Sequence, residues 1–397
     1  MRPSSLAVLL PALLLLACGP EGVAPIPADS RATSASSASG PASASAATSA
    51  SSAATSAVAE GGPAPSGSAA APKSPAIEAD PAMAERVAAL VKDLPHPADD
   101  VGAGFLGPVD PKLDAEWITR MASAEIAEIT PNKGGGSVSM RLKFKDGKKA
   151  ALKAEQTGHP TDPRSEIAAY HLDRLLGFGR TAAVVGRRFD MAKIRAALVA
   201  SKAEPAFLER LDKLVVRDGH LDAALIAWHT APLVEEETAP AWATTLADKD
   251  PVTKDMLTLL KDWSDLVVFD FLVDNPDRFS GGNILRLDKG GPIVFLDQGA
   301  AFGRGRLAAK QTTMDRLSKV CRFRRETLSA LKKVGSAAGK DGSLGAQLAK
   351  SLAKDPLSPV LDDAQIRGVD ERMKMLEAHV KACSAKMGEA VLLSAAP

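Results

Sequence analysis

The sequence predicts an α+β fold of two lobes, in which a small lobe rich in strands surrounds one key helix and the second lobe is mainly helical. Three observations support this prediction. Short apolar runs separated by glycine-containing turns fill residues 126–154, as in antiparallel strands. A capped amphipathic helix follows at 161–176. Helical spacing of apolar residues then dominates beyond about residue 240.

Turn residues and capping residues set the elements of the first lobe. The helix that starts at 161–166 has an acidic N-cap and a proline in its first turn, and Gly177 ends it. Turns at 131–136 and 145–147 carry the glycines typical of hairpins. The predicted strands lie at 126–130, 137–144, 149–154, 182–185 and 221–226, and two helices precede them at 81–94 and 113–121.

The second lobe is predicted to be helical because its apolar residues recur at intervals of three and four. A short strand near residues 283–285 and a buried apolar strand at 293–296 interrupt this pattern. The predicted helices lie at 251–261, 263–273, 311–319, 325–333, 344–352 and 363–387.

Composition excludes several classes of protein. The 49 Lys and Arg residues against 48 Asp and Glu give a net charge of +1, without the basic excess of a nucleic-acid-binding protein. Three cysteines are too few for a disulfide-dense mini-protein or a four-cysteine zinc site. Beyond the N-terminal segment, no run of about 18 uncharged apolar residues is present, so we expect no spanning helix in the mature chain.

The N-terminus is typical of a secretory signal peptide. Arg2 precedes an apolar stretch at 6–17 that is too short to span a membrane. Its end, LLAC at 15–18, resembles a bacterial lipobox, which implies cleavage before Cys18 and acylation of that cysteine. Gly19, in place of an aspartate, favours the outer membrane of a double-membrane bacterium. The alternative is an ordinary signal peptide with an incidental cysteine.

Residues 18–80 are predicted to be a disordered tether. They are rich in Ala, Ser and Pro and have almost no large apolar side chains, so burial cannot offset the entropy lost on ordering. The folded domain is therefore expected at 81–392, with the first lobe at about 110–230 and the second at about 235–392.

Gly134, Gly135 and Gly136 form a turn whose backbone N–H groups could approach an anion closely. Lys153 follows on a predicted strand, and Glu166 lies in the first turn of the capped helix. Each residue has a plain alternative, namely a hairpin glycine, a surface lysine and a glutamate that offsets the helix dipole. A strand lysine paired with a helix glutamate is, however, how kinases hold nucleotide phosphates.

Three polar residues in the second lobe complete the set. Asp277 and Asn283 lie in a glycine-bearing loop after an apolar helix, where an aspartate can accept a hydroxyl proton and an asparagine can ligate a metal. Asp297 ends a buried apolar strand, where an acid is costly unless something binds it. Turn formation is the alternative for all three. Along the chain, the glycine turn, the lysine, the glutamate, the loop aspartate and the last aspartate follow one another. This order matches the parts that kinases use in phosphoryl transfer, namely an anion-binding turn, a phosphate lysine, its glutamate, a base and a metal-binding acid.

A long block then resembles a known family. Residues 166–178 read EIAAYHLDRLLGF and residues 184–187 read VVGR. They resemble the helix EIAAFHLDR and the following VGR strand of secretory-pathway kinases of the Golgi casein kinase and four-jointed type. Asn275–Pro276–Asp277–Arg278 and Phe295–Leu296–Asp297 resemble that family's catalytic loop and metal-binding step. The similarity covers about residues 125–335.

The resemblance implies an atypical protein-kinase-like fold that phosphorylates secreted proteins or glycans with ATP and Mn²⁺ or Mg²⁺, with the nucleotide between the lobes. By matched motif, Lys153 would hold the phosphates and Glu166 would face Lys153 or the metal. Asp277 would be the base, Asp297 a metal ligand and Asn283 a second one.

The chain departs from this family in three places. Gly282 occupies the position five residues after the base, where kinase loops usually place the metal asparagine. Phe279 stands where the family often has histidine, and 177–183 lacks the usual prolines. Trp228 is either a residue of the hinge near adenine or a plain core tryptophan.

Cys321 and Cys383 remain after Cys18 is assigned to the lipid. In an oxidising envelope two such cysteines are expected to pair, and family members also carry disulfides in this lobe. The alternative is two buried free thiols.

We therefore expect a lipid-anchored kinase of the bacterial envelope that moves the ATP γ-phosphoryl group to a hydroxyl of a protein or glycan. A pseudokinase scaffold that binds nucleotide without turnover is the second hypothesis. An envelope lipoprotein that binds no nucleotide is the third. In all three the membrane is reached through the lipid on Cys18.

Overall fold

The computed structural model describes residues 77–394 apart from 93, 95–109, 133–135, 229–231, 237–240, 281, 288–289, 304–308 and 336–341. The predicted signal peptide at 1–17, the predicted lipidation site Cys18 and most of the predicted tether lie outside the described residues. Among the described residues, no helix is both long and apolar enough to cross a membrane.

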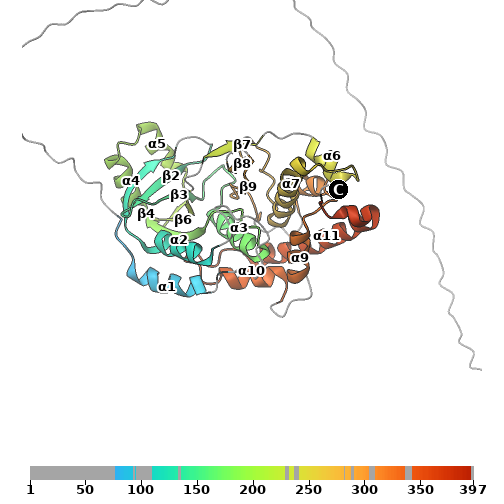
Figure 1. Cartoon of the computed structure of the whole chain (residues 1–397). Coiled ribbons are helices and arrows are strands. Elements are labelled where there is room, and N and C mark those ends of the chain that lie inside the picture. The colour runs from blue at the N-terminus through green and yellow to red at the C-terminus, as the bar shows by residue number, and fades with distance from the viewer. Residues whose placement is uncertain are drawn as a thin grey trace, which may run out of the picture. The chain divides into compact units, whose positions relative to one another are not determined.

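The expected α+β architecture is confirmed. An antiparallel sheet has the order β1-β2-β3-β6-β4, with β5 pairing the first residues of β6, and a second sheet has the order β7-β8-β9 (Figure 1). The strands are β1 (Ile126–Pro131), β2 (Ser139–Phe144), β3 (Lys149–Ala154), β4 (Val184–Asp190), β5 (Val216–Arg217), β6 (His220–Ala227), β7 (Leu233–Glu235), β8 (Ile284–Leu287) and β9 (Ile293–Phe295).

Helices make up most of the chain after the second sheet begins. The described α-helices are α1 (Pro81–Lys92), α2 (Pro111–Ser123), α3 (Pro163–Leu176), α4 (Met191–Ala200), α5 (Pro205–Arg210), α6 (Ala241–Ala247), α7 (Lys254–Val273), α8 (Gln311–Leu317), α9 (Arg325–Val334), α10 (Leu344–Leu352) and α11 (Asp363–Met387). The sequence patterns did not predict α4, α5 or α6.

One prediction for the helical part is wrong. The two helices expected at 251–261 and 263–273 are a single helix, α7. No glycine or proline stands between the two stretches, so nothing interrupts the backbone hydrogen bonds. The long helix carries the chain to Asp274, whose left-handed backbone (φ 55°) ends it and starts the polar loop.

Helix α3 is the central helix of the fold. The Asp162 side chain accepts a hydrogen bond from the Arg164 backbone N–H (2.9 Å), and Gly177 adopts the left-handed conformation that ends the helix. In Figure 1, α3 lies between the larger sheet and the C-terminal helices, and it contacts β4, β6, α7, α9 and α10. Almost all of its residues are therefore buried, including His171, which packs in the core.

A close approach at Gly186 joins the larger sheet to the C-terminal helices. The Gly186 N–H on β4 donates to the Asp355 carboxylate (3.1 Å), which also accepts the Leu357 N–H (2.8 Å). A Cβ at position 186 would lie 2.4 Å from an Asp355 oxygen and 2.6 Å from Leu357 Cγ. Only glycine allows the α10–α11 connection to dock here.

We expect Gly186→Ala to lower the free energy of unfolding by about 1–3 kcal/mol, because the extra carbon overpacks this contact. The measurement is chemical denaturation. Gly136→Ala is a matched control, since its Cβ would meet only His159 Nε2, at an ordinary 3.7 Å. Equal stability of the two variants would mean that the Gly186 contact does not constrain the fold.

A second prediction concerns pH. Burial raises the pKa of Asp355 to about 6, against the lowering effects of the Leu357 and Gly186 N–H groups and of Arg164 and Arg86. A raised carboxyl pKa favours the protonated folded form, so this contribution to stability is complete below about pH 4 and is lost as pH rises through 6. Its size is on the order of 3 kcal/mol.

The measurement is the slope of unfolding free energy against pH between 4 and 7, in the parent and in Asp355→Asn. In the variant, the decrease in unfolding free energy that Asp355 causes as pH rises should be absent, whatever the absolute stability of the variant. Parallel curves would show that Asp355 does not titrate in this range.

Candidate active site

The candidate site is a cleft of about 290 Å³ between the larger sheet and the segments that follow α7. Its wall is mostly apolar, and its polar residues gather together at one end. The lining residues are Ala151, Lys153, Glu166, Thr181, Ala182, Val184, Ile226, Ala227, Trp228, Leu233, Gly282, Asn283, Phe295, Leu296, Asp297 and Gln298. A ligand with a flat apolar part and a charged part fits such a lining.

Lys153 lies between two carboxylates at the polar end. Its Nζ is 2.9 Å from Glu166 Oε1 on α3 and 2.9 Å from Asp297 Oδ1 after β9. Glu166 is buried, with 4% of its side chain exposed, and Lys153 is 15% exposed. Three residues that are far apart in the sequence thus meet in one ionic cluster.

Charge compensation determines the protonation of this cluster. Burial alone would lower the pKa of Lys153, but the carboxylates of Glu166 and Asp297 raise it above its ordinary value. Burial opposes ionisation of Asp297 as well, yet the Lys153 ammonium and the Arg278 guanidinium hold its pKa below the ordinary value. Lys153 is therefore a cation and Asp297 an anion near neutral pH.

The backbone after β9 aims Asp297 into the cleft. Asp297 has a left-handed backbone (φ 53°), and its carbonyl oxygen accepts a hydrogen bond from Asn275 Nδ2 (3.1 Å). The following segment is fixed to α3, because the Asp162 N–H donates to the Gly299 carbonyl (2.9 Å) and the Ser165 hydroxyl donates to the Ala301 carbonyl (2.8 Å). Helix α3 thus holds both Glu166 and the segment that carries Asp297.

Arg278 fixes the polar loop after α7. Its side chain is completely buried, and its guanidinium donates to the Asp270 carboxylate at 3.0–3.1 Å and to the Asn283 carbonyl at 3.1 Å. It also donates to the Leu296 carbonyl, one residue before Asp297. One cation therefore joins α7, the loop and the end of β9.

Asp277 and Asn283 lie on this loop. Asn283 lines the cleft, and its Nδ2 donates to the Asp277 carbonyl (3.1 Å), which leaves its amide oxygen available to a ligand. The Asp277 carboxylate accepts a hydrogen bond from the Ser280 hydroxyl. Gly282, five residues after Asp277, has φ +78° and no side chain to offer a ligand, and the asparagine that lines the cleft is the next residue.

The glycine turn is only partly described. Gly134 and Gly135 lie outside the described residues, and their binding role stays a prediction. Gly136 lies beside His159, and its carbonyl accepts a hydrogen bond from Arg210 (3.1 Å). Trp228 is half-buried in the cleft wall, and the Arg141 guanidinium lies 4.4 Å from its ring centre.

Sequence reasoning missed two supporting residues. Asn275 is completely buried, and its Nδ2 donates to both the Asp297 carbonyl and the Gln298 side chain (2.9 Å), a role that its place in the matched loop motif did not reveal. Arg278 was noted beside Asp277 without a role. A positively charged residue inside an otherwise apolar and acidic stretch is the signal that could have found it.

The oxygen donors of the cleft suit a hard divalent cation. The carboxylates of Glu166 and Asp297 and the amide oxygen of Asn283 come from three elements and line the same cleft. Magnesium and manganese prefer such oxygen ligands. The residues present therefore fit the metal that the sequence predicted.

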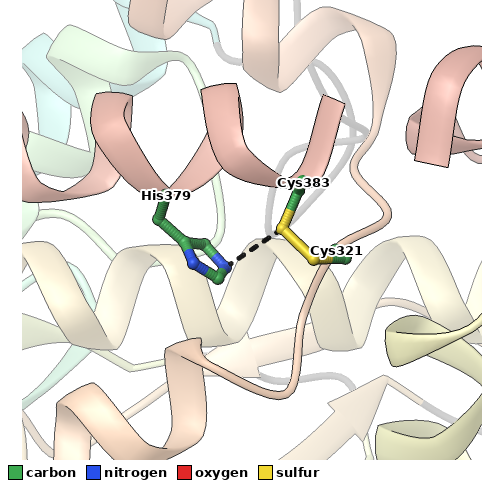
Figure 2. Close-up of side chains that lie close together, drawn as sticks. All are labelled: Cys321, His379 and Cys383. Atoms are coloured by element: carbon green, nitrogen blue, oxygen red, sulfur yellow. Dashed lines mark hydrogen bonds between the residues drawn. A yellow bond between two sulfur atoms is a disulfide. The ribbon is translucent and has the colours of Figure 1, made fainter. Parts of the chain in front are cut away.

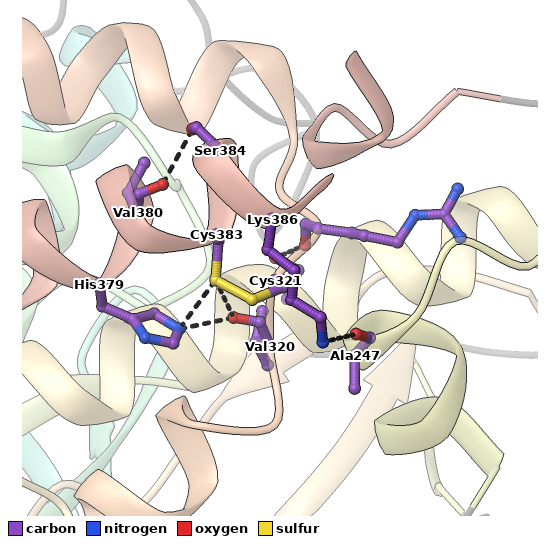
Figure 3. Close-up of a disulfide and its surroundings, with 10 residues drawn as sticks. Ala247, Val320, Cys321, His379, Val380, Cys383, Ser384 and Lys386 are labelled. Atoms are coloured by element: carbon purple, nitrogen blue, oxygen red, sulfur yellow. Dashed lines mark hydrogen bonds between the residues drawn. A yellow bond between two sulfur atoms is a disulfide. The ribbon is translucent and has the colours of Figure 1, made fainter. Parts of the chain in front are cut away.

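Cys321 and Cys383 form a disulfide, as the sequence predicted, which joins the segment after α8 to α11 (Figure 3). Together with it, the Cys321 N–H donates to the Leu246 carbonyl (2.8 Å) and the Lys386 ammonium to the Ala247 carbonyl (3.2 Å). These contacts hold the ends of α6 and α11 together.

Comparison with known proteins shows which family this chain belongs to. Residues 105–208 and 227–391 match the family described as Fam20C, Golgi casein kinase, C-terminal, Fam20. Human glycosaminoglycan xylosylkinase is 27% identical over 56% of this chain and 61% of its own length. The human pseudokinase FAM20A is 26% identical over 57% and 48%, and the human extracellular serine/threonine protein kinase FAM20C is 23% identical over 75% and 62%. The chain thus spans about half to three fifths of the length of these relatives.

Solved structures share the fold. A crystal structure of the Golgi casein kinase with Mn/ADP bound has a TM-score of 0.57 at 21% identity, covering 72% of this chain and 79% of that one. The structure of hydra Fam20 with sugar has a TM-score of 0.58 at 23% identity, covering 76% and 97%. With the family match covering more than half of the sequence, the chain belongs to the Fam20 family of Golgi casein kinase type.

Proposed function

We propose that this chain is an ATP-dependent kinase that transfers the γ-phosphoryl group to a hydroxyl of a protein or glycan. The observation that carries the proposal is Lys153, held at 2.9 Å from both Glu166 and Asp297 at the polar end of an apolar cleft. The apolar wall suits a nucleobase, and the charged end suits its phosphates. Named relatives include a protein kinase and a xylosylkinase, which supports hydroxyl acceptors of both kinds.

Each residue has a role in this proposal. Lys153 positions the phosphates, and Glu166 keeps the ammonium in place or contributes to the metal site. Asp297 and Asn283 hold Mg²⁺ or Mn²⁺, which when bound neutralises phosphate charge. Asp277 accepts or orients the proton of the acceptor hydroxyl. The glycine turn at 134–136 is the proposed cover over the phosphates.

The same proposal includes a location outside the cytosol. The lipobox-like end of the signal peptide supports acylation of Cys18, with residues 19–80 as a tether to the membrane and the outer membrane as the favoured site. The Cys321–Cys383 disulfide is consistent with an oxidising compartment.

A nucleotide-binding pseudokinase is the second candidate. One relative is a pseudokinase, and the asparagine that faces the cleft here is shifted by one residue from its usual spacing. Against it, Lys153, Glu166 and Asp297 converge, and Asn283 of the same cleft is bonded to the backbone of Asp277. The enzyme is therefore preferred.

Metal and nucleotide should act together. We expect ATP with Mn²⁺ to raise the melting temperature of the parent, and chelation of the metal to remove most of that shift.

Labelled ATP should give phosphoryl transfer or slow hydrolysis in the parent and neither in Asp297→Ala. Equal signals from parent and variant would remove Asp297 from the mechanism.

The base is tested separately by Asp277→Asn. We expect transfer to fall by roughly 10²–10⁴-fold, the usual contribution of general base catalysis, with the ATP-dependent melting shift retained. Asp212→Asn, at an exposed aspartate that does not line the cleft, is the control. Nucleotide binding without turnover in the parent, across protein and glycan acceptors, would favour the pseudokinase.

A further inference from the structure

A cluster of metal-binding side chains lies outside the proposed nucleotide cleft, at the disulfide. His379 and Cys383 are four residues apart on α11, so they lie on one face of the helix, and Cys321 reaches them from the segment after α8 (Figure 2). The two sulfurs and a ring nitrogen of His379 all lie within 4.8 Å of one another. We propose that, once the disulfide is reduced, Cys321, Cys383 and His379 bind a zinc ion.

The donor set points to zinc rather than to the metals of kinases. Thiolates and imidazole are soft or borderline ligands that suit Zn²⁺, whereas Mg²⁺ and Mn²⁺ prefer oxygen. Two thiolates and one neutral imidazole would cancel the two positive charges of Zn²⁺. A site without net charge suits a buried position, and Cys383 is 2% exposed and Cys321 8% exposed.

The geometry already contains one edge of a zinc tetrahedron. Zn–S and Zn–N distances of about 2.3 and 2.0–2.1 Å give a separation of about 3.5 Å between S and N ligands at the tetrahedral angle. His379 Nε2 lies 3.5 Å from Cys383 Sγ. To complete the third position, Cys321 Sγ has to move away from Cys383. The Val320 carbonyl, 2.7 Å from His379 Nε2, also has to turn away so that zinc can approach this nitrogen.

The surrounding backbone can support the fourth position. The Val320 carbonyl oxygen lies 2.7 Å from His379 Nε2 and 3.6 Å from Cys383 Sγ. In the disulfide form this carbonyl accepts the Nε2 proton. With zinc at Nε2, the ring proton would shift from Nε2 to Nδ1, so that the imidazole stays neutral. The Val320 carbonyl, once turned away from Nε2, could accept a hydrogen bond from a zinc-bound water.

The redox change balances with a dithiol reductant. The dithiol gives two electrons and two protons to the disulfide, becomes a disulfide itself and leaves Cys321 and Cys383 as thiols. Zinc binding then releases the two thiol protons as the thiolates form. The metal thereby joins the segment after α8 to α11 in place of the covalent bond, so that this contact survives in reducing conditions.

The test is a titration of the full chain with Co²⁺, a spectroscopic substitute for zinc, followed by displacement with Zn²⁺. Cys18→Ser removes the remaining cysteine. After reduction we expect thiolate-to-cobalt charge-transfer bands and the strong visible bands of tetrahedral cobalt, both of which should saturate at one cobalt per chain. The disulfide form should give neither. Absence of these bands in the reduced chain would overturn the proposal.

His379→Gln distinguishes a ligand from a simple hydrogen-bond donor. Glutamine can still donate to the Val320 carbonyl, so the disulfide form should keep its melting temperature. In the reduced form, zinc affinity should fall by more than the roughly 10–100-fold caused by loss of an outer-shell partner. His220→Gln, at an exposed histidine, is the control. Equal zinc affinity of the His379→Gln and parent chains would contradict the proposal.

Discussion

The ion pairs of Lys153 are the constraint on which the rest of the site depends. A buried ammonium is costly unless carboxylates surround it, and here one comes from α3 and one from the segment after β9. The larger sheet, the central helix and the second sheet must therefore approach one another at a single point. The Gly299 and Ala301 contacts to the start of α3 reinforce the same approach from the backbone.

A second buried cation organises the other side of the cleft. Arg278 satisfies carbonyls on the loop and before Asp297 while it pairs with Asp270 on α7. Because Asp270 is buried and the two carbonyls are partly buried, removing the guanidinium would leave several acceptors without partners. Arg278, which is itself buried, thus fixes the backbone that carries the side chains of Asn283 and Asp297. This division between residues that face the cleft and residues that fix them is typical of preorganised sites.

Much of this could be predicted from the sequence, because short-range signals were strong. The cap at Asp162, the left-handed Gly177 and the glycine turns identified α3 and the first strands to within a few residues. The convergence of Lys153, Glu166 and Asp297 was inferred from their order and from the family resemblance. Spacing alone could not show that Asn283 lines the cleft, one residue beyond the usual position of the metal asparagine, since that depends on the path of the loop in three dimensions.

Other features depend on tertiary contacts that no local pattern encodes. The need for glycine at 186 follows from an aspartate far away in the sequence. The proximity of His379 to the disulfide likewise appears only when α11 packs beside the segment after α8. Sequence reasoning named the cysteines but not the histidine.

The most direct measurement is a crystal structure with a non-hydrolysable ATP analogue and Mn²⁺, using the anomalous signal of manganese to locate the metal. The account predicts a manganese peak at the Asp297 carboxylate, phosphate oxygens at Lys153 Nζ and the base against the apolar wall near Val184. Nucleotide bound elsewhere, or manganese distant from Asp297, would contradict it.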